Sequence, residues 1–128
     1  MQLTLKTYRD SQSLIITDVT KDSFVLQVNS GGYAGVVLFH HYNTAVFDDF
    51  IANMAALAAT NSGAATLVDV EDNQLRFSLD VRGHLEVSGR LIPHTIPYQE
   101  LQFGFITDQT CLASFIADLK KARHEAKN

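Results

Sequence analysis

The sequence predicts an α+β fold in a single domain of residues 1–128, built as a curved antiparallel sheet of about eight strands with two helices packed on one face. Alternating polar and apolar residues dominate 1–40 and 64–106, as expected for strands. Helical spacing of apolar residues occurs at 44–60 and again after residue 107. No linker, repeat or low-complexity tract interrupts this order of four strands, a helix, four strands and a second helix.

The composition is that of an ordinary globular protein. Hydrophobic residues make up 46% and charged residues 19% of the 128 residues, which is enough for a core without covalent staples. The single cysteine, Cys111, excludes a disulfide framework. A net charge of −4 disfavours direct nucleic-acid binding and suits a basic protein partner. Without a signal peptide or a membrane-spanning apolar run, we expect a cytoplasmic protein with no membrane contact.

Residues 1–40 predict the first group of strands. The segments SLIITDVT and SFVLQVN are rich in β-branched and aromatic residues, and the polar clusters RDSQ and TKD separate the strands. Gly31 and Gly32 then form a tight turn into the strand YAGVVLFH.

Residues 44–60 predict the first helix. Asn43 or Thr44 offers an N-cap oxygen, and the segment NSG after the helix is a stop signal. Apolar residues recur at i, i+3 and i+4 and form one stripe: Val46, Phe47, Phe50, Ile51, Met54, Leu57 and Ala58.

The second group of strands has a strict period of two, which indicates a sheet with one dry and one wet face. For the first hairpin we take Asp72-Asn73 as a two-residue turn. This register places Val68 opposite Phe77 and Asp69 opposite Arg76, so that apolar meets apolar and acid meets base.

The next hairpin allows two registers. A loop of residues 82–84 would place Asp80 opposite Glu86, which is repulsive. A loop of residues 81–83 places Asp80 opposite His84 and puts Gly83 in the left-handed position that this turn requires. We choose the second register. The chain then closes with a helix capped by Thr107 or Asp108, with its buried stripe at Leu112, Phe115, Ile116 and Leu119.

The segment LFHHYNTAVFDDF raises the question of a metal or catalytic site. His40 and His41 are adjacent at a strand end, so their side chains point to opposite faces and do not ligate one metal. Asp48 and Asp49 lie in the first two helical turns, where carboxylates complement the helix dipole. We therefore predict no metal site in this segment.

Other candidate chemistry is equally weak. His84 and Glu86 share a face but have no third ligand at a recognisable spacing. NSGGYAG lacks the P-loop and dinucleotide patterns, and Cys111 beside the apolar stripe is interpreted as a structural thiol with no base nearby. We predict neither an enzyme nor a cofactor.

The order of the predicted helices and strands is similar to that of a known protein family. FDDFIANMAALAAT is followed by ATLVDVED, by NQLRFSLDVRGHLEVSGRL and by a final helix containing LASFIADL. Over residues 24–124 this order resembles the WapI-like immunity proteins, which are encoded beside toxins in bacterial polymorphic-toxin loci. Gly83, His84, Leu85 and Val87 match the family pattern of Gly-His-apolar-any-apolar.

The resemblance implies a cytoplasmic protein that binds and occludes the C-terminal domain of a cognate toxin, often a nuclease. We expect this protein to be a monomer or a weak homodimer. Acidic side chains would be natural contacts for the basic cleft of a nuclease. The candidate toxin-binding residues are Asp48, Asp49, Glu71, Asp72, Asp80 and Glu86.

A second class of function stays open at this point. A small-ligand-binding or regulatory module would use a pocket between the sheet and the helices, lined by Phe77, Phe103 and Phe105. An enzyme is a third reading, and it would need a concave site where His40, His41 or His84 meets a carboxylate.

Overall fold

The computed structural model of the protein describes residues 2–7, 11–93 and 98–126. The first sheet contains β1 (Leu3–Lys6), β2 (Gln12–Thr17), β3 (Ser23–Ser30) and β4 (Tyr33–His40). The second contains β5 (Gly63–Val68), β6 (Gln74–Leu79), β7 (His84–Leu91) and β8 (Leu101–Asp108). Helix α1 (Thr44–Thr60) connects the two sheets. Helix α2 (Leu112–Glu125) follows β8 after the 3₁₀ turn η1 (Gln109–Cys111).

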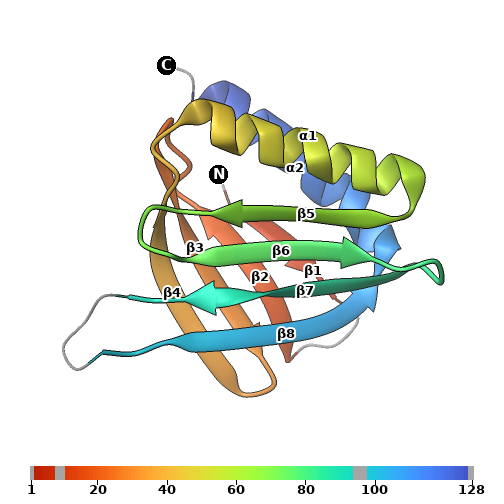
Figure 1. Cartoon of the computed structure of the whole chain (residues 1–128), viewed down its shortest axis with the longest axis horizontal. Helices are drawn as coiled ribbons and strands as arrows, with labels where there is room; N and C mark the ends of the chain where they lie inside the picture. Colours follow the sequence, from red (N-terminus) through yellow and green to blue (C-terminus); the bar gives the residue numbers. More distant parts are fainter. Residues whose placement is uncertain (1, 8–10, 94–97, 127–128) are drawn as a thin grey trace.

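The predicted α+β class and the order of the elements are confirmed, and the eight strands divide into two sheets of four rather than forming one continuous sheet. Strands that follow each other in the chain pair antiparallel within each sheet. Figure 1 shows the two sheets face to face, with their strands crossing at a large angle. Helices α1 and α2 lie side by side across one open side, where α1 packs on β5 and α2 packs on β1.

The core lies between the two sheets and beneath the helices. Every strand contributes alternate side chains to one buried cluster, and both helices add their apolar stripes. Phe77 of β6 shows how the layers meet, because its ring centroid lies 6.1 Å from that of Phe50 in α1 and 5.9 Å from that of Phe115 in α2. The same three rings therefore hold one sheet and both helices together.

Helix α1 has the bounds that the sequence predicts. The Asn43 side chain accepts a hydrogen bond from the Ala45 backbone N–H at 2.9 Å, and Asn61 ends the helix in the left-handed conformation. The buried face is narrower than the predicted stripe: Val46 is 39% exposed and Ala58 is half-buried.

The first predicted hairpin register is wrong. Val68 lies opposite Gln74 and Ala65 lies opposite Phe77, so the connection is a five-residue loop, residues 69–73, instead of a two-residue turn. The shift is an odd number of residues, so it reverses the face on which each β5 side chain lies, and Val68 is 48% exposed.

Asp69 is the physical reason for the longer loop. One oxygen of its carboxylate accepts hydrogen bonds from the backbone N–H groups of Glu71 and Asn73, at 2.9 and 2.8 Å. The other accepts from the Asn73 side chain at 3.0 Å and from the backbone N–H of His40 at 2.9 Å. Asp69 is only 6% exposed, and these bonds satisfy its buried charge better than the predicted surface pair with Arg76.

The second predicted register is confirmed. Phe77 lies opposite Val87 and Ser78 lies opposite Glu86, and Gly83 takes the positive φ of 80° that this loop requires. Asp108 caps the 3₁₀ turn η1 and not the closing helix itself, because its carboxylate accepts from the Thr110 backbone N–H at 2.8 Å. Helix α2 begins after Cys111, which makes no side-chain capping bond, so neither Thr107 nor Asp108 caps it as predicted.

Candidate functional site

The two histidines of the β4–α1 junction point apart. His41 is 4% exposed and packs against the rings of Phe47 and Phe24, with centroid distances of 4.8 and 6.1 Å. His40 lies on the other side and stacks on Tyr42 at 5.1 Å. Within the described ranges, no group of three or more His, Cys, Asp or Glu side chains comes together to hold a metal ion. His41 therefore packs in the core, whereas His40 lies at the surface of the junction.

Cys111 is also held in a structural role. Its thiol donates a hydrogen bond to the Asp108 backbone oxygen at 2.8 Å. Burial is the largest influence on its pKa and raises it, which keeps the thiol protonated and weakens it as a nucleophile.

The acidic pair of α1 is divided between two roles. Arg123 of α2 is buried, and its guanidinium donates to the two carboxylate oxygens of Asp48 at 2.8 and 3.3 Å. This bidentate pair ties α1 to α2 and occupies the Asp48 carboxylate. Asp49 is exposed to solvent.

Glu71 and Asp72 lie in the loop that Asp69 organises. Asp72 is exposed, has a positive φ of 65°, and its backbone oxygen accepts from the Arg90 side chain at 3.3 Å. Glu71 is half-buried and lines a small pocket beside His40 at the end of β4.

Asp80 and Glu86 belong to the β6–β7 hairpin. The backbone N–H groups of His84 and Arg82 bond the Asp80 carboxylate and lower its pKa, and the His84 ring lies 3.4 Å from the same carboxylate. Asp80 is thus part of the turn. Glu86 is exposed on the outer face of β7, between Ser78 of β6 and Ile106 of β8.

The six acidic residues do not form one patch. Asp72 and Asp80 flank the two ends of β6, a separation of about 20 Å at the usual rise of a strand. Asp48 and Asp49 belong to helix α1, outside both sheets. A partner that contacts all six would have to cover more than one side of the molecule.

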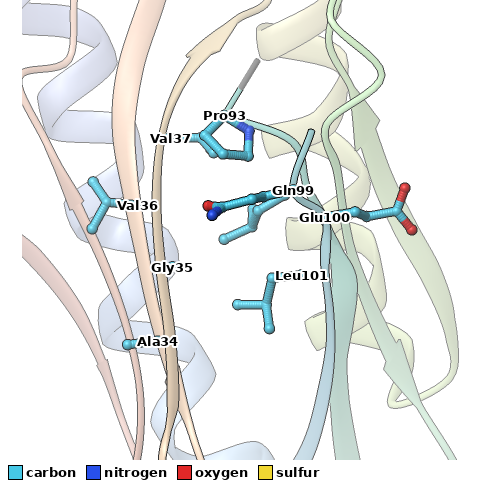
Figure 2. Close-up of a pocket in the computed structure, with 9 residues that line it drawn as sticks. Ala34, Gly35, Val36, Val37, Pro93, Gln99, Glu100 and Leu101 are labelled. Carbon is cyan, nitrogen blue, oxygen red and sulfur yellow. The ribbon is translucent and has the colours of Figure 1, made fainter. Parts of the chain in front are cut away.

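The structure also contains a groove that the sequence reasoning missed. A pocket of about 550 Å³ lies between β4 and the chain that enters β8, and Leu91 and Pro93 line it as well. Figure 2 shows the side chains of Gln99 and Leu101 pointing toward β4, whereas Val36 and Glu100 point away from the gap. A second pocket of about 230 Å³ continues along β4 to His40 and shares Val36, Val37 and Pro93 with the first. We call the two pockets together the β4 groove.

The outer side of β4 beside this groove is apolar and exposed. Val36 is 54% and Leu38 is 49% exposed on this face. Tyr33, at the start of the strand and on the opposite face, is also exposed. A signal for this was present in the sequence, because the run YAGVVLFH is apolar at both parities, whereas the strands of the second group alternate. Apolar residues on both faces of a strand indicate either burial on both sides or an exposed apolar surface.

The pocket expected for a small-ligand module would lie elsewhere. Phe77 is fully buried against Phe50 and Phe115, and Phe103 and Phe105 are 8% and 4% exposed. These rings are part of the packed core, whereas the β4 groove lies farther along the same inner face of the second sheet, beside Leu91 and Leu101.

A small α+β protein with surface acids and an open groove fits the class of proteins that act by binding other proteins. A comparison with family models matches residues 23–126 to the immunity protein WapI-like family, so the chain belongs to the WapI-like immunity proteins. The match runs from β3 to the end of α2 and leaves β1 and β2 outside it. No match is found among curated proteins or among solved structures.

Family membership implies a role in toxin immunity and a toxin protein as the partner. Among the described residues, no helix is long and apolar enough to cross a membrane.

Proposed function

We propose that this protein neutralises a nuclease-type toxin in the cytoplasm by binding its C-terminal domain and covering the active surface, without catalysing a reaction itself. The family match over residues 23–126 is the observation that carries the proposal, because it includes both helices and six of the eight strands. The net charge of −4 supports it, since a nuclease must present a basic surface to nucleic acid.

The six acidic candidates differ in how directly their carboxylates could contact the toxin. Asp49, Asp72 and Glu86 are exposed and can meet a basic partner without breaking an internal hydrogen bond that the structure shows. The carboxylates of Asp48 and Asp80 are held by Arg123 and by the β6–β7 turn, so their contribution would be through the local negative potential. Glu71 lies where the acidic loop meets the β4 groove.

The direct test is growth rescue. The toxin domain encoded beside this gene is expressed in a sensitive host, with and without this protein, and the purified pair is then examined for a 1:1 complex. We expect rescue and a stable complex whose dissociation constant rises with salt. Failure to rescue growth, together with no complex at low salt, would overturn the proposal.

The acidic contacts are tested by single substitutions. Asp49→Asn and Asp72→Asn should each weaken toxin binding by about threefold, the size of an exposed ion pair. Asp118→Asn is the matched control, because Asp118 is exposed on α2 away from the loop and the groove. Equal affinity for all three variants and the wild type would remove these two residues from the contact surface.

A further inference from the structure

Strand β4 is an edge strand with a regular set of outward-facing backbone groups. It pairs on one side with β3, through a two-residue turn that places Ser30 opposite Tyr33. In an antiparallel pair closed this way, the N–H and C=O groups of Tyr33 and every second residue after it point toward β3. The groups of Ala34, Val36, Leu38 and His40 therefore point toward the free edge.

The contacts of His40 confirm this parity and show that the edge accepts a partner. Its backbone N–H donates to the Asp69 carboxylate at 2.9 Å, and its backbone oxygen accepts from the Val70 N–H at 3.2 Å. The β5–β6 loop thus pairs with the last residue of β4 and stops there. At Ala34, Val36 and Leu38, no backbone hydrogen bond to another element occurs within the described part of the chain.

The β4 groove runs along this same edge. Residues 34–38 and His40 form one wall, and the opposite wall contains the end of β7 with Ile92 and Pro93, together with Gln99 and Leu101. The backbone N–H of Ile92 is already bonded to the Asn73 side chain at 2.7 Å, so the opposite wall keeps its shape without using β4. Long exposed strand edges are usually covered, because they pair readily with other chains.

We propose that the free edge of β4 binds an extended segment of the toxin, which adds to the first sheet as a fifth strand. This inference rests on the proposed function and names the surface that carries it out. The segment would be uncharged or β-branched where it passes Val36, because the exposed side chains beside it on that face are Val36 and Leu38. It would carry a basic residue at the end that reaches Glu71 and Asp72, the acidic loop beside His40.

Amide hydrogen exchange followed by NMR reads this surface residue by residue. On addition of the neighbouring toxin domain, the amides of Ala34, Val36 and Leu38 should exchange at least about tenfold more slowly. The amides of Gly35 and Val37 bond β3 in the free protein, so their exchange should change much less. A toxin complex in which Ala34, Val36 and Leu38 exchange as in the free protein would overturn the inference and leave the proposed function intact. Absence of any complex would overturn both.

A proline at the edge gives an independent test. Val36→Pro removes an N–H that faces the groove and takes none from the β3–β4 ladder, a position where edge strands tolerate proline. We expect toxin binding to weaken by about tenfold or more, with circular dichroism unchanged. The matched control Val36→Ala keeps the N–H and should bind within about threefold of the wild type.

Two outcomes of this test would count against the inference. Equal binding by the proline and alanine variants would contradict strand pairing at this edge. If the same amides are protected without toxin and sedimentation gives a dimer, β4 is the contact between two copies of this chain, and the toxin assignment is wrong.

Discussion

Among the described residues, three charged or titratable side chains are buried, and they differ in how their neighbours accommodate them. Asp69 is satisfied by hydrogen bonds from its own loop and from β4. Arg123 donates from Nε and Nη2 to Asp48, while its buried Nη1 has no hydrogen-bond partner among the described residues. His41 differs, because it lies among the rings of Phe24 and Phe47. Burial of this kind favours the neutral imidazole.

His41 should make the stability of the protein depend on pH. Burial is the largest influence on its pKa and lowers it below the ordinary value of 6.5, as does Arg123. The backbone of Asn43 and the carboxylates of Asp22 and Asp48 act in the opposite direction. Because the unfolded chain binds a proton more readily than the folded one, the free energy of unfolding should decrease as the pH falls below about 6.5.

Urea denaturation at pH 7.5 and pH 5.5 measures this effect. We expect the loss of stability between the two pH values to be smaller in His41→Phe than in the wild type, because phenylalanine does not titrate. His124→Gln is the control, since His124 is exposed on α2, and its loss should match that of the wild type. An equal loss in the wild type and in His41→Phe would show that His41 is not the group responsible.

At the scale of single elements, the hairpins show how turn chemistry decides register. The β6–β7 loop follows the rule read from the sequence, because a glycine at its third position supplies a positive φ. The β5–β6 loop departs from the expected turn because the Asp69 carboxylate binds backbone donors of residues further along the chain. Asp72 takes a positive φ in that loop, as Asp and Asn do more readily than other non-glycine residues.

Alanine substitutions at two glycines of the second sheet should have different effects on the free energy of unfolding. A Cβ added at Gly89 in β7 would lie 2.0 Å from the backbone oxygen of Gln74, which cannot move without breaking the β6–β7 pairing. At Gly104 in β8 the nearest atoms are 3.9 Å away. Gly89→Ala should therefore lower the free energy of unfolding by about 3 kcal/mol or more.

Gly104→Ala is the matched control for this prediction. It should leave stability unchanged or raise it by about 0.5 kcal/mol, because alanine loses less conformational entropy than glycine in a strand. Chemical denaturation of the two variants measures the difference. Similar stabilities would mean that β6 and β7 are not as close at Gly89 as the structure places them.

At the scale of the whole molecule, the two helices close the open side between the crossed sheets. Helix α1 packs on β5 and α2 packs on β1, so each helix belongs to a different sheet (Figure 1). The contact between α1 and α2, with its Asp48–Arg123 pair, therefore links the two sheets as well. On the opposite side, the sheets approach at Gly35, where an added Cβ would lie 2.8 Å from the Leu101 side chain.

A substitution at Phe115 tests how much the packing of α2 over the open side between the sheets contributes to stability. It is 1% exposed on α2, and its ring meets Phe77 of the second sheet. Phe115→Ala should lower the free energy of unfolding by about 3–5 kcal/mol, the usual cost of removing a buried phenylalanine ring. Ser114→Ala, at the exposed neighbouring position, should change it by less than about 0.5 kcal/mol. A Phe115→Ala variant as stable as the Ser114→Ala variant would show that α2 is dispensable for the core.

The sequence predicts the elements well because their signals are local. The bounds of α1 follow from Asn43, from the apolar spacing and from the NSG stop, and the β6–β7 register follows from Gly83 and charge pairing. The site is less predictable. The reason is that the Asp48–Arg123 contact joins residues 75 positions apart, and nothing local indicates that Asp48 is already paired.

The sequence by itself determined the α+β class, the order of strands and helices, the buried stripes and the resemblance to immunity proteins, because each depends on residue types at short spacing. Only the tertiary structure decided that the strands form two crossed sheets and that Asp69 buries its charge in a loop. It also decided that the described part of the chain leaves most of the β4 edge unpaired beside a groove. Those features depend on contacts between segments far apart in the chain, and such contacts leave no periodic signal in the sequence.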